Sequence, residues 1–247
     1  MEVHAHTHTA RKKWTHYFWE FLMLFLAVFC GFLAEYGLEH KIETDREKQY
    51  VRTMIEDLKL DTSVLNGVIQ ARTRRIEMLD SLSLMLYEAG NKDHLSDLYF
   101  FSRYISRVSP ITFTYNDRTI QQMKNSGGLR LIRNRVVSDS IILYDSGVRY
   151  IESAQEREAN YVGDCLPHCY KIFDGRIYDR MLGDDNILHR PSGNPSLLQS
   201  TTENINAFNG SLHLVKSINR SNRVFSIQLY NKAVNLLTTI KTEYHLK

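Results

Sequence analysis

Residues 21–34 read FLMLFLAVFCGFLA and include no charged side chain. Extended back to Trp14, the segment has 21 residues, and Glu20 is its only acid. At about 1.5 Å of rise per residue, a helix of this length reaches roughly 30 Å, the thickness of a bilayer core. Trp14 and Tyr36 flank the segment, where interfacial aromatic residues are favoured. The pattern predicts a transmembrane helix over 14–36.

Two other interpretations of this segment have less support. A buried core helix would fit the 14 uncharged residues, but no other part of the chain is as apolar. A cleaved signal peptide would fit the basic residues 11–13 and the apolar run after them. Its cleavage site would not fit, because Phe32 and Phe29 occupy the small-residue positions required for cleavage near Ala34 or Cys30. We therefore expect an uncleaved signal anchor.

Basic residues close to the anchor predict its orientation. Residues 11–13 (RKK) directly precede it, whereas residues 35–50 mix acidic and basic side chains. Lysine and arginine counts on the two sides are equal, so the prediction depends on the closeness of the first cluster. We expect a short His-rich cytoplasmic tail over 1–13 and an extracytoplasmic helical domain over 37–247.

The anchor has two unlike faces at about 100° per residue. Phenylalanines form one side, and the other carries Ala27, Cys30, Gly31 and Ala34. Ala27 and Gly31 form a small-xxx-small pattern, which lets helix backbones approach closely. Glu20 projects on the same side, and an acidic side chain is placed more favourably against a partner helix than against lipid. We expect these five residues to pack on another transmembrane helix; the alternative is a chance grouping in which Glu20 only reaches the headgroups.

Beyond Tyr36 the helical pattern continues. Apolar residues recur at spacings of three and four from Val51 to Leu86, with Arg72 in one core position, so a long amphipathic helix is expected to about Glu88. A helix of this length must bury its apolar face in a bundle or a coiled coil.

The rest of the chain also favours helices, since only 4 Pro and 12 Gly interrupt it. Further helices are expected over 93–108, 116–125, 134–173 and 201–245, with a turn at 126–128 and a loop over 174–200. No segment alternates with period two for long enough to predict a sheet. The expected fold is all-α: one N-terminal transmembrane helix continuing into a long amphipathic helix and an extramembrane helical bundle.

Three motifs carry a resemblance. Residues 17–28 read YFWEFLMLFLAV, residues 31–35 read GFLAE, and residues 125–132 read NSGGLRLI. In these motifs the chain resembles an uncharacterised family of bacterial single-pass inner-membrane proteins with a His-rich N-terminal tail and a helical C-terminal domain. The match is close over the anchor and loose elsewhere. It implies a bacterial inner-membrane location with the same architecture, and it implies no reaction.

Two groups of residues could bind metal. The tail holds His4, His6, His8 and His16 with Glu2, a pattern that binds Zn²⁺, Ni²⁺ or Cu²⁺ weakly or serves only as a polar tail. The second group is Cys165-Leu166-Pro167-His168-Cys169. Its thiols fit packing in a core, a short disulfide, or half of a zinc site that lacks a further ligand at a diagnostic spacing.

A third group lies in the loop over 174–200. It comprises Asp174, Asp179, Asp184, Asp185, His189 and Arg190. Carboxylates beside a histidine can form a hydrolase site or a solvated loop. Residues 183–186 (GDDN) look like the start of a calcium loop, but the remaining pattern is missing.

The motifs of the common enzyme classes are missing, including the P-loop, G-x-G-x-x-G, G-x-S-x-G and H-E-x-x-H. A formal net charge of +3 is too small and scattered to indicate nucleic-acid binding. The sequence therefore predicts a membrane-anchored interaction or scaffold protein without catalysis or a cofactor. Its expected partners are the lipid bilayer and a second copy or another membrane protein. The alternatives are a ligand-sensing helical bundle acting through another membrane protein and an exported hydrolase using the 174–195 loop.

Overall fold

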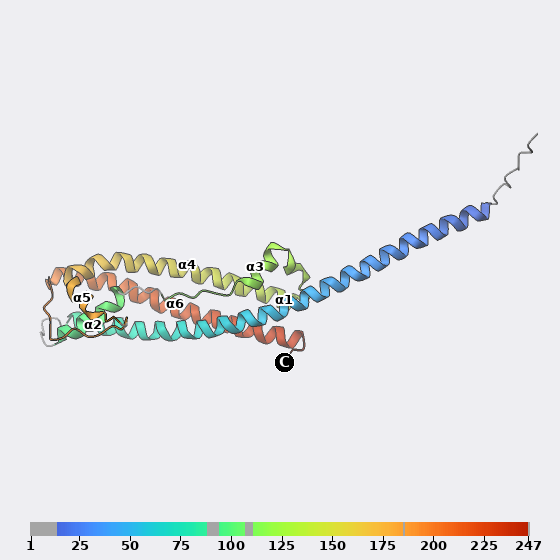
Figure 1. The fold of residues 1–247 in the computed structure, drawn as a ribbon. Helices are drawn as coiled ribbons and strands as arrows, with labels where there is room; N and C mark the ends of the chain where they lie inside the picture. The colour runs from blue at the N-terminus through green and yellow to red at the C-terminus, as the bar shows by residue number, and fades with distance from the viewer. Residues whose placement is uncertain (1–13, 88–93, 107–110, 185, 247) are drawn as a thin grey trace, which may run out of the picture. The chain divides into compact units, whose positions relative to one another are not determined.

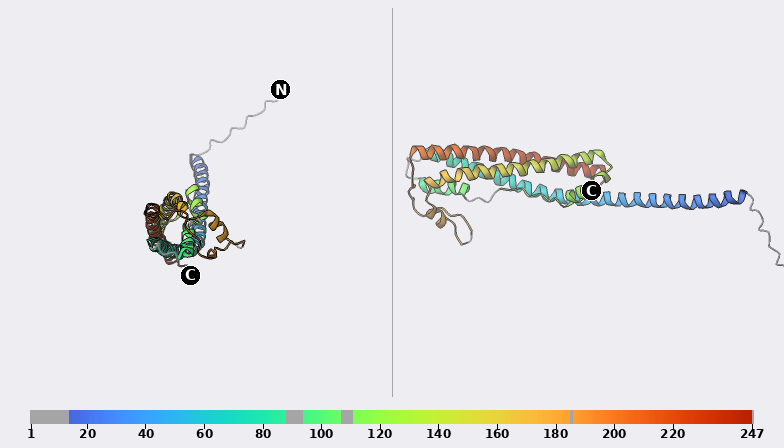
Figure 2. Two further views of the ribbon diagram at one scale, coloured as in Figure 1. Left: turned by 90° about the vertical axis from the view of Figure 1, so that its left-hand side faces the viewer. Right: turned by 90° about the horizontal axis from the view of Figure 1, so that it is seen from above.

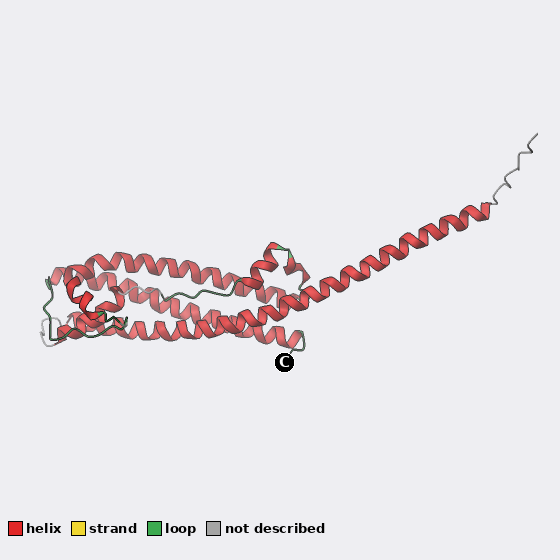
Figure 3. Ribbon diagram, viewed as in Figure 1, coloured by secondary structure: helices red, strands yellow, loops and turns green. Residues whose placement is uncertain are grey.

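The structure, a computed structural model, describes residues 14–87, 94–106, 111–184 and 186–246. Within these ranges the regular secondary structure is helical, and no strand is present (Figure 3). An isolated bridge pairs Leu182 with Leu188. The prediction of an all-helical chain is confirmed. The chain divides into two compact units, Met1–Tyr50 and Val51–Lys247.

The first unit contains the N-terminal part of α1 (Trp14–Tyr87). This helix is long and apolar enough to cross a membrane, and none of its most apolar stretch of 18 residues is buried. Such full exposure differs from what a core helix shows. On one side of the helix the rings of Phe21, Phe25 and Phe29 stack, with centroids 6.2 and 5.8 Å apart.

The second unit combines the remainder of α1 with the other helices. These are α2 (Leu95–Ser106), α3 (Arg118–Asn125), a 3-10 helix (Gly128–Leu131), α4 (Arg135–Ile172), α5 (Gly175–Met181) and α6 (Thr202–Glu243). Figures 1 and 2 show α4, α6 and the part of α1 beyond Tyr50 running side by side. In this group α4 follows the direction of α1, and α6 runs the opposite way.

The predicted boundaries of the longer helices lie within two residues of those observed, because local signals fix them. The Asn134 side chain accepts a hydrogen bond from the backbone N–H of Val137 at 3.2 Å and caps α4. Thr201 caps α6 in the same way, through the N–H of Asn204 at 3.3 Å. Both contacts satisfy donors that a helix start leaves unpaired. Gly127 has the left-handed φ of 66° that its turn requires.

The prediction of a loop over 174–200 was wrong at residues 175–181, which form α5. The Asp174 side chain caps this helix by accepting from the N–H of Arg176 at 2.8 Å. Tyr178 and Met181, three residues apart, turn to the core and are buried. In the sequence, the glycines around this helix indicated a loop, although the capping residue Asp174 and the spacing of Tyr178 and Met181 were present.

A hydrophobic core forms where α1, α2, α4, α5 and α6 meet. Tyr99 is fully buried there, and its ring packs edge-on against Phe173 with centroids 5.1 Å apart. Phe100 and Phe101 are only partly buried against the same core. The Tyr99 hydroxyl also donates a hydrogen bond to the Ser196 carbonyl at 3.0 Å, which fastens the segment after α5 to α2.

Leu82 and Leu84 provide a matched test of this core. Leu82 is 0% exposed and Leu84 is 63% exposed, two positions apart on α1. We expect Leu82→Ala to lower the free energy of unfolding by about 2–5 kcal/mol, because it removes buried methyl groups and leaves a cavity. Leu84→Ala should change it by about 0.5 kcal/mol or less. Urea unfolding of the full chain in detergent measures both free-energy changes. Equal losses of stability in the two variants would contradict the packing of Leu82 in the core.

Candidate functional site

The residues predicted as the packing face of the anchor lie together on the exposed surface of α1. They are Glu20, Ala27, Cys30, Gly31 and Ala34, called here the small face. His16 Nε2 lies 3.0 Å from Glu20 Oε1, one turn along the same side. A Cβ added at Gly31 would meet nothing within 4 Å, so no contact within the described chain requires a glycine there.

A second candidate site lies inside the second unit, between α1, α4 and α6. We call it the polar layer, and it consists of Arg72, Arg75, Glu158, Asn219 and Asn222, all buried. The sequence placed only Arg72 in a core position. Glu158 could have been recognised as well, because it lies four residues after Ala154 and four before Val162 on the buried stripe of α4.

The Glu158 carboxylate connects all three helices of the polar layer. Its Oε2 accepts hydrogen bonds from Arg72 Nη1 at 2.6 Å and from Asn222 Nδ2 at 2.8 Å. Its Oε1 accepts from Arg75 Nη1 at 3.4 Å. Arg72 Nη2 donates to the Ile111 carbonyl at 2.7 Å, so the segment before α3 is held by the same guanidinium.

The charges of the polar layer do not balance, since two guanidinium groups share one carboxylate. Burial lowers the pKa of Arg75, and the attraction of Glu158 opposes that shift. Arg75 Nε and Nη2 and Arg72 Nε have no hydrogen-bond partner in the described part of the chain. Buried polar groups are nearly always paired, so this arrangement leaves unused donor capacity in the interior.

Two further buried carboxylates hold the segment before α3 and the start of α3 in place. Asp61 accepts from the Tyr144 hydroxyl at 2.6 Å and from the N–H of Asn116 at 2.8 Å. Burial raises the pKa of Asp61. Asp57 lies 2.9 Å from Arg118 Nη2 and accepts from the N–H of Thr119 at 3.1 Å. Each carboxylate is occupied by structural contacts, so we assign neither to catalysis.

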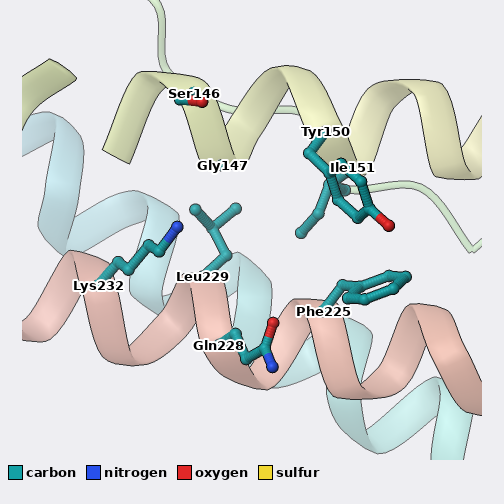
Figure 4. A pocket seen from close by; sticks show the side chains of 8 residues that line it. All are labelled: Ser146, Gly147, Tyr150, Ile151, Phe225, Gln228, Leu229 and Lys232. Carbon is teal, nitrogen blue, oxygen red and sulfur yellow. The ribbon is translucent and has the colours of Figure 1, made fainter. Parts of the chain in front are cut away.

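An open groove of about 300 Å³ lies between α4 and α6 (Figure 4). The rings of Tyr150 and Phe225 meet edge to face in it, with centroids 4.8 Å apart. A Cβ on Gly147 would lie 2.9 Å from Leu229 Cδ1, so glycine permits the close approach of the two helices. The volume of the groove is at the lower end of the range found for small-molecule sites. The lining residues are Ser146, Gly147, Tyr150, Ile151, Phe225, Gln228, Leu229 and Lys232.

The two cysteines of α4 are free and buried. The Ser211 hydroxyl donates to Cys165 Sγ at 3.4 Å, and Cys169 Sγ lies 3.4 Å from the Tyr178 hydroxyl. Burial raises the pKa of Cys165 to about 11 and that of Cys169 to about 12. Protonated, enclosed thiols match the packing interpretation, and the structure contains no disulfide between them.

The described acids of the predicted 174–195 loop do not form a cluster of three. Asp174 caps α5, and its contact with Arg176 lowers the pKa of Asp174. Arg190 pairs with Asp97 and lies 4.5 Å above the ring of Phe100. The other described members, Asp179, Asp184 and His189, are exposed.

The described residues contain no group of three side chains able to hold a metal ion. Some of the predicted ligands lie outside the described residues, and these are Glu2, His4, His6, His8 and Asp185.

Replacing Glu158 tests the polar layer. Glu158→Gln should lower the free energy of unfolding by about 3–5 kcal/mol, because it leaves both buried arginines without a counter-charge. Glu156→Gln is the matched control, since Glu156 is exposed two positions earlier on the same helix. Chemical denaturation of the full chain reports both changes. A Glu158→Gln protein as stable as the control would show that the pairing contributes nothing.

Comparisons of this chain with known protein families, with curated proteins and with solved structures find no match. The resemblance of the anchor to a bacterial membrane-protein family therefore stays a prediction.

Proposed function

We propose that the chain is a membrane-anchored interaction or scaffold protein that associates with a second copy of itself through the small face of its anchor. The observation that carries the proposal is the exposure of that face on an apolar helix, with Glu20 and His16 paired along it. Residues 14–36 would lie in the bacterial inner membrane. The tail over 1–13 would be cytoplasmic, and the helices beyond the anchor would form an extracytoplasmic bundle.

The membrane explains why small residues matter at such a face. Lipid tails are as apolar as leucine, so helices in a bilayer associate by close packing and polar contacts rather than by the hydrophobic effect. Gly31 and Ala27 would let two backbones approach closely. Glu20 would then lie against the partner helix instead of lipid, which favours the paired state.

The second unit supports an interaction role more than catalysis. The buried carboxylates Asp61 and Glu158 are engaged in structural contacts, and Asp174 caps a helix. The arrangement of its long helices offers extended outer faces, on which Leu60, Leu143 and Val224 are exposed. A bundle of this kind suits binding to another protein or to a second copy.

A ligand-sensing bundle is the second candidate, and the groove between α4 and α6 favours it. The groove combines the aromatic rings of Tyr150 and Phe225 with the ammonium of Lys232. Small-molecule sites share this mixture of apolar walls and a few polar groups. In this second candidate function, the output would pass through another membrane protein.

Cysteine crosslinking tests self-association. Cys30 is exposed on the small face, so mild oxidation of the protein in lipid vesicles should give a disulfide-linked dimer. Gly31→Leu should weaken dimerisation about tenfold, because the larger side chain separates the backbones. Phe29→Leu changes the opposite face and should leave it unchanged. Failure of Cys30 to crosslink in bilayers, or equal effects of the two substitutions, would overturn the proposed dimer.

Topology is tested by a cysteine at Ser192, which is exposed in the segment after α5. With the three native cysteines replaced, Ser192→Cys in intact cells should react with a membrane-impermeant maleimide. An exported second unit predicts this result, because the reagent cannot reach the cytoplasm. A cysteine placed in the tail at Thr7 is the control and should react only after lysis. The reverse pattern would mean that the anchor has the opposite orientation.

A further inference from the structure

The groove between α4 and α6 has different chemistry at its two ends. Figure 4 shows the rings of Tyr150 and Phe225 at one end, where they face each other from the two helices. The ammonium of Lys232 lies toward the other end, and Leu229 lies between it and the rings. The groove therefore offers an apolar surface that continues into a charged one. A ligand that fits it has the same order of groups, an apolar body followed by a charged end.

Lys232 supplies the charge, and its ammonium has no acidic neighbour on the groove wall. A Cβ added to Gly147 would lie 3.5 Å from Lys232 Nζ, which places the ammonium on the wall close to α4. The residues that line the groove include no carboxylate. Within the described part of the chain, Lys232 also takes part in no ion pair or hydrogen bond. Such a cation attracts an anionic group and repels a second cation.

The donors and the volume of the groove favour a small monocarboxylate. The Lys232 ammonium and the side-chain amide of Gln228 can donate to the two oxygens of one carboxylate. Gly147, beside the ammonium, and Tyr150 lie three residues apart on α4, which is about 4.5 Å of helical rise. A short aliphatic chain between ring and carboxylate covers such a distance. The volume of about 300 Å³ admits a compact molecule of this kind.

We propose that this groove binds a small aromatic monocarboxylate, with its ring against Tyr150 and Phe225 and its carboxylate on the ammonium of Lys232. The inference rests on the second candidate function, the ligand-sensing bundle, and names the class of its ligand. It is independent of self-association through the small face, because the groove belongs entirely to the second unit. Lys232 is exposed, so solvent screens the ion pair and the affinity is modest.

Ligand-observed saturation-transfer NMR on the full chain in detergent tests the charged end, with phenylbutyrate as the probe and empty micelles as the background. Phenylbutyrate should bind with a dissociation constant on the order of 1 mM. It should bind about fivefold more tightly than its neutral amide. Lys232→Gln should remove this difference. Lys241→Gln should keep it, because Lys241 is on the same helix outside the groove.

Two outcomes of this titration would overturn the proposal in different ways. Equal binding of the acid and the amide to the unaltered chain would exclude a carboxylate site, and would leave the groove to neutral ligands of a sensing bundle. Absence of binding by both compounds would remove the ligand-sensing candidate together with the proposal. Neither result bears on self-association, which the crosslinking of Cys30 tests.

The aromatic end is tested by Tyr150→Ala. Tyr150 is 49% exposed, so the variant should fold with an unchanged unfolding midpoint while phenylbutyrate binds about fivefold more weakly. Tyr161→Ala is the matched control, since Tyr161 is also exposed on α4 and lies outside the groove. Equal affinities in the two variants would contradict the placement of the ligand ring and overturn the proposal.

Discussion

One buried carboxylate joins the three long helices of the second unit. Glu158 on α4 accepts from arginines on α1 and from Asn222 on α6, so three long helices meet at one charged group. Apolar faces alone would let such helices slide by a turn, because one leucine replaces another at little cost. A buried ion pair breaks when the helices shift, and each unpaired charge then costs several kcal/mol. We therefore expect this contact to favour one register of the three helices.

The apolar side chains of the two units lie in opposite environments. In the second unit leucines such as Leu58 and Leu79 are fully buried, and ordinary burial of apolar surface stabilises the fold. In the first unit most apolar side chains between Trp14 and Ile42 are exposed. Water disfavours such a surface, which is why the proposal places it in a bilayer against a neighbouring helix. The proposed function follows from this contrast rather than from any arrangement of reactive groups.

Helical periodicity and caps made most of the fold predictable, since α4 and α6 begin directly after Asn134 and Thr201. Local patterns missed α5, whose one-turn spacing of Tyr178 and Met181 was too short to stand out among the glycines. The residues of the small face could be grouped from the sequence because they belong to one helix, and their role in packing stays a prediction. The polar layer was not predictable, since Glu158 and Arg72 lie 86 positions apart and only tertiary packing brings them together.

The extended segment 111–117 has its main-chain groups bonded to side chains of the long helices. The partners are Arg72 and Asp61 on α1 and Gln155 on α4, between 39 and 55 positions away in the chain. The segment gains these bonds only after both helices have reached their native register, and closing such loops carries an entropy cost. We therefore expect this segment to become ordered late in folding and to be released early in unfolding.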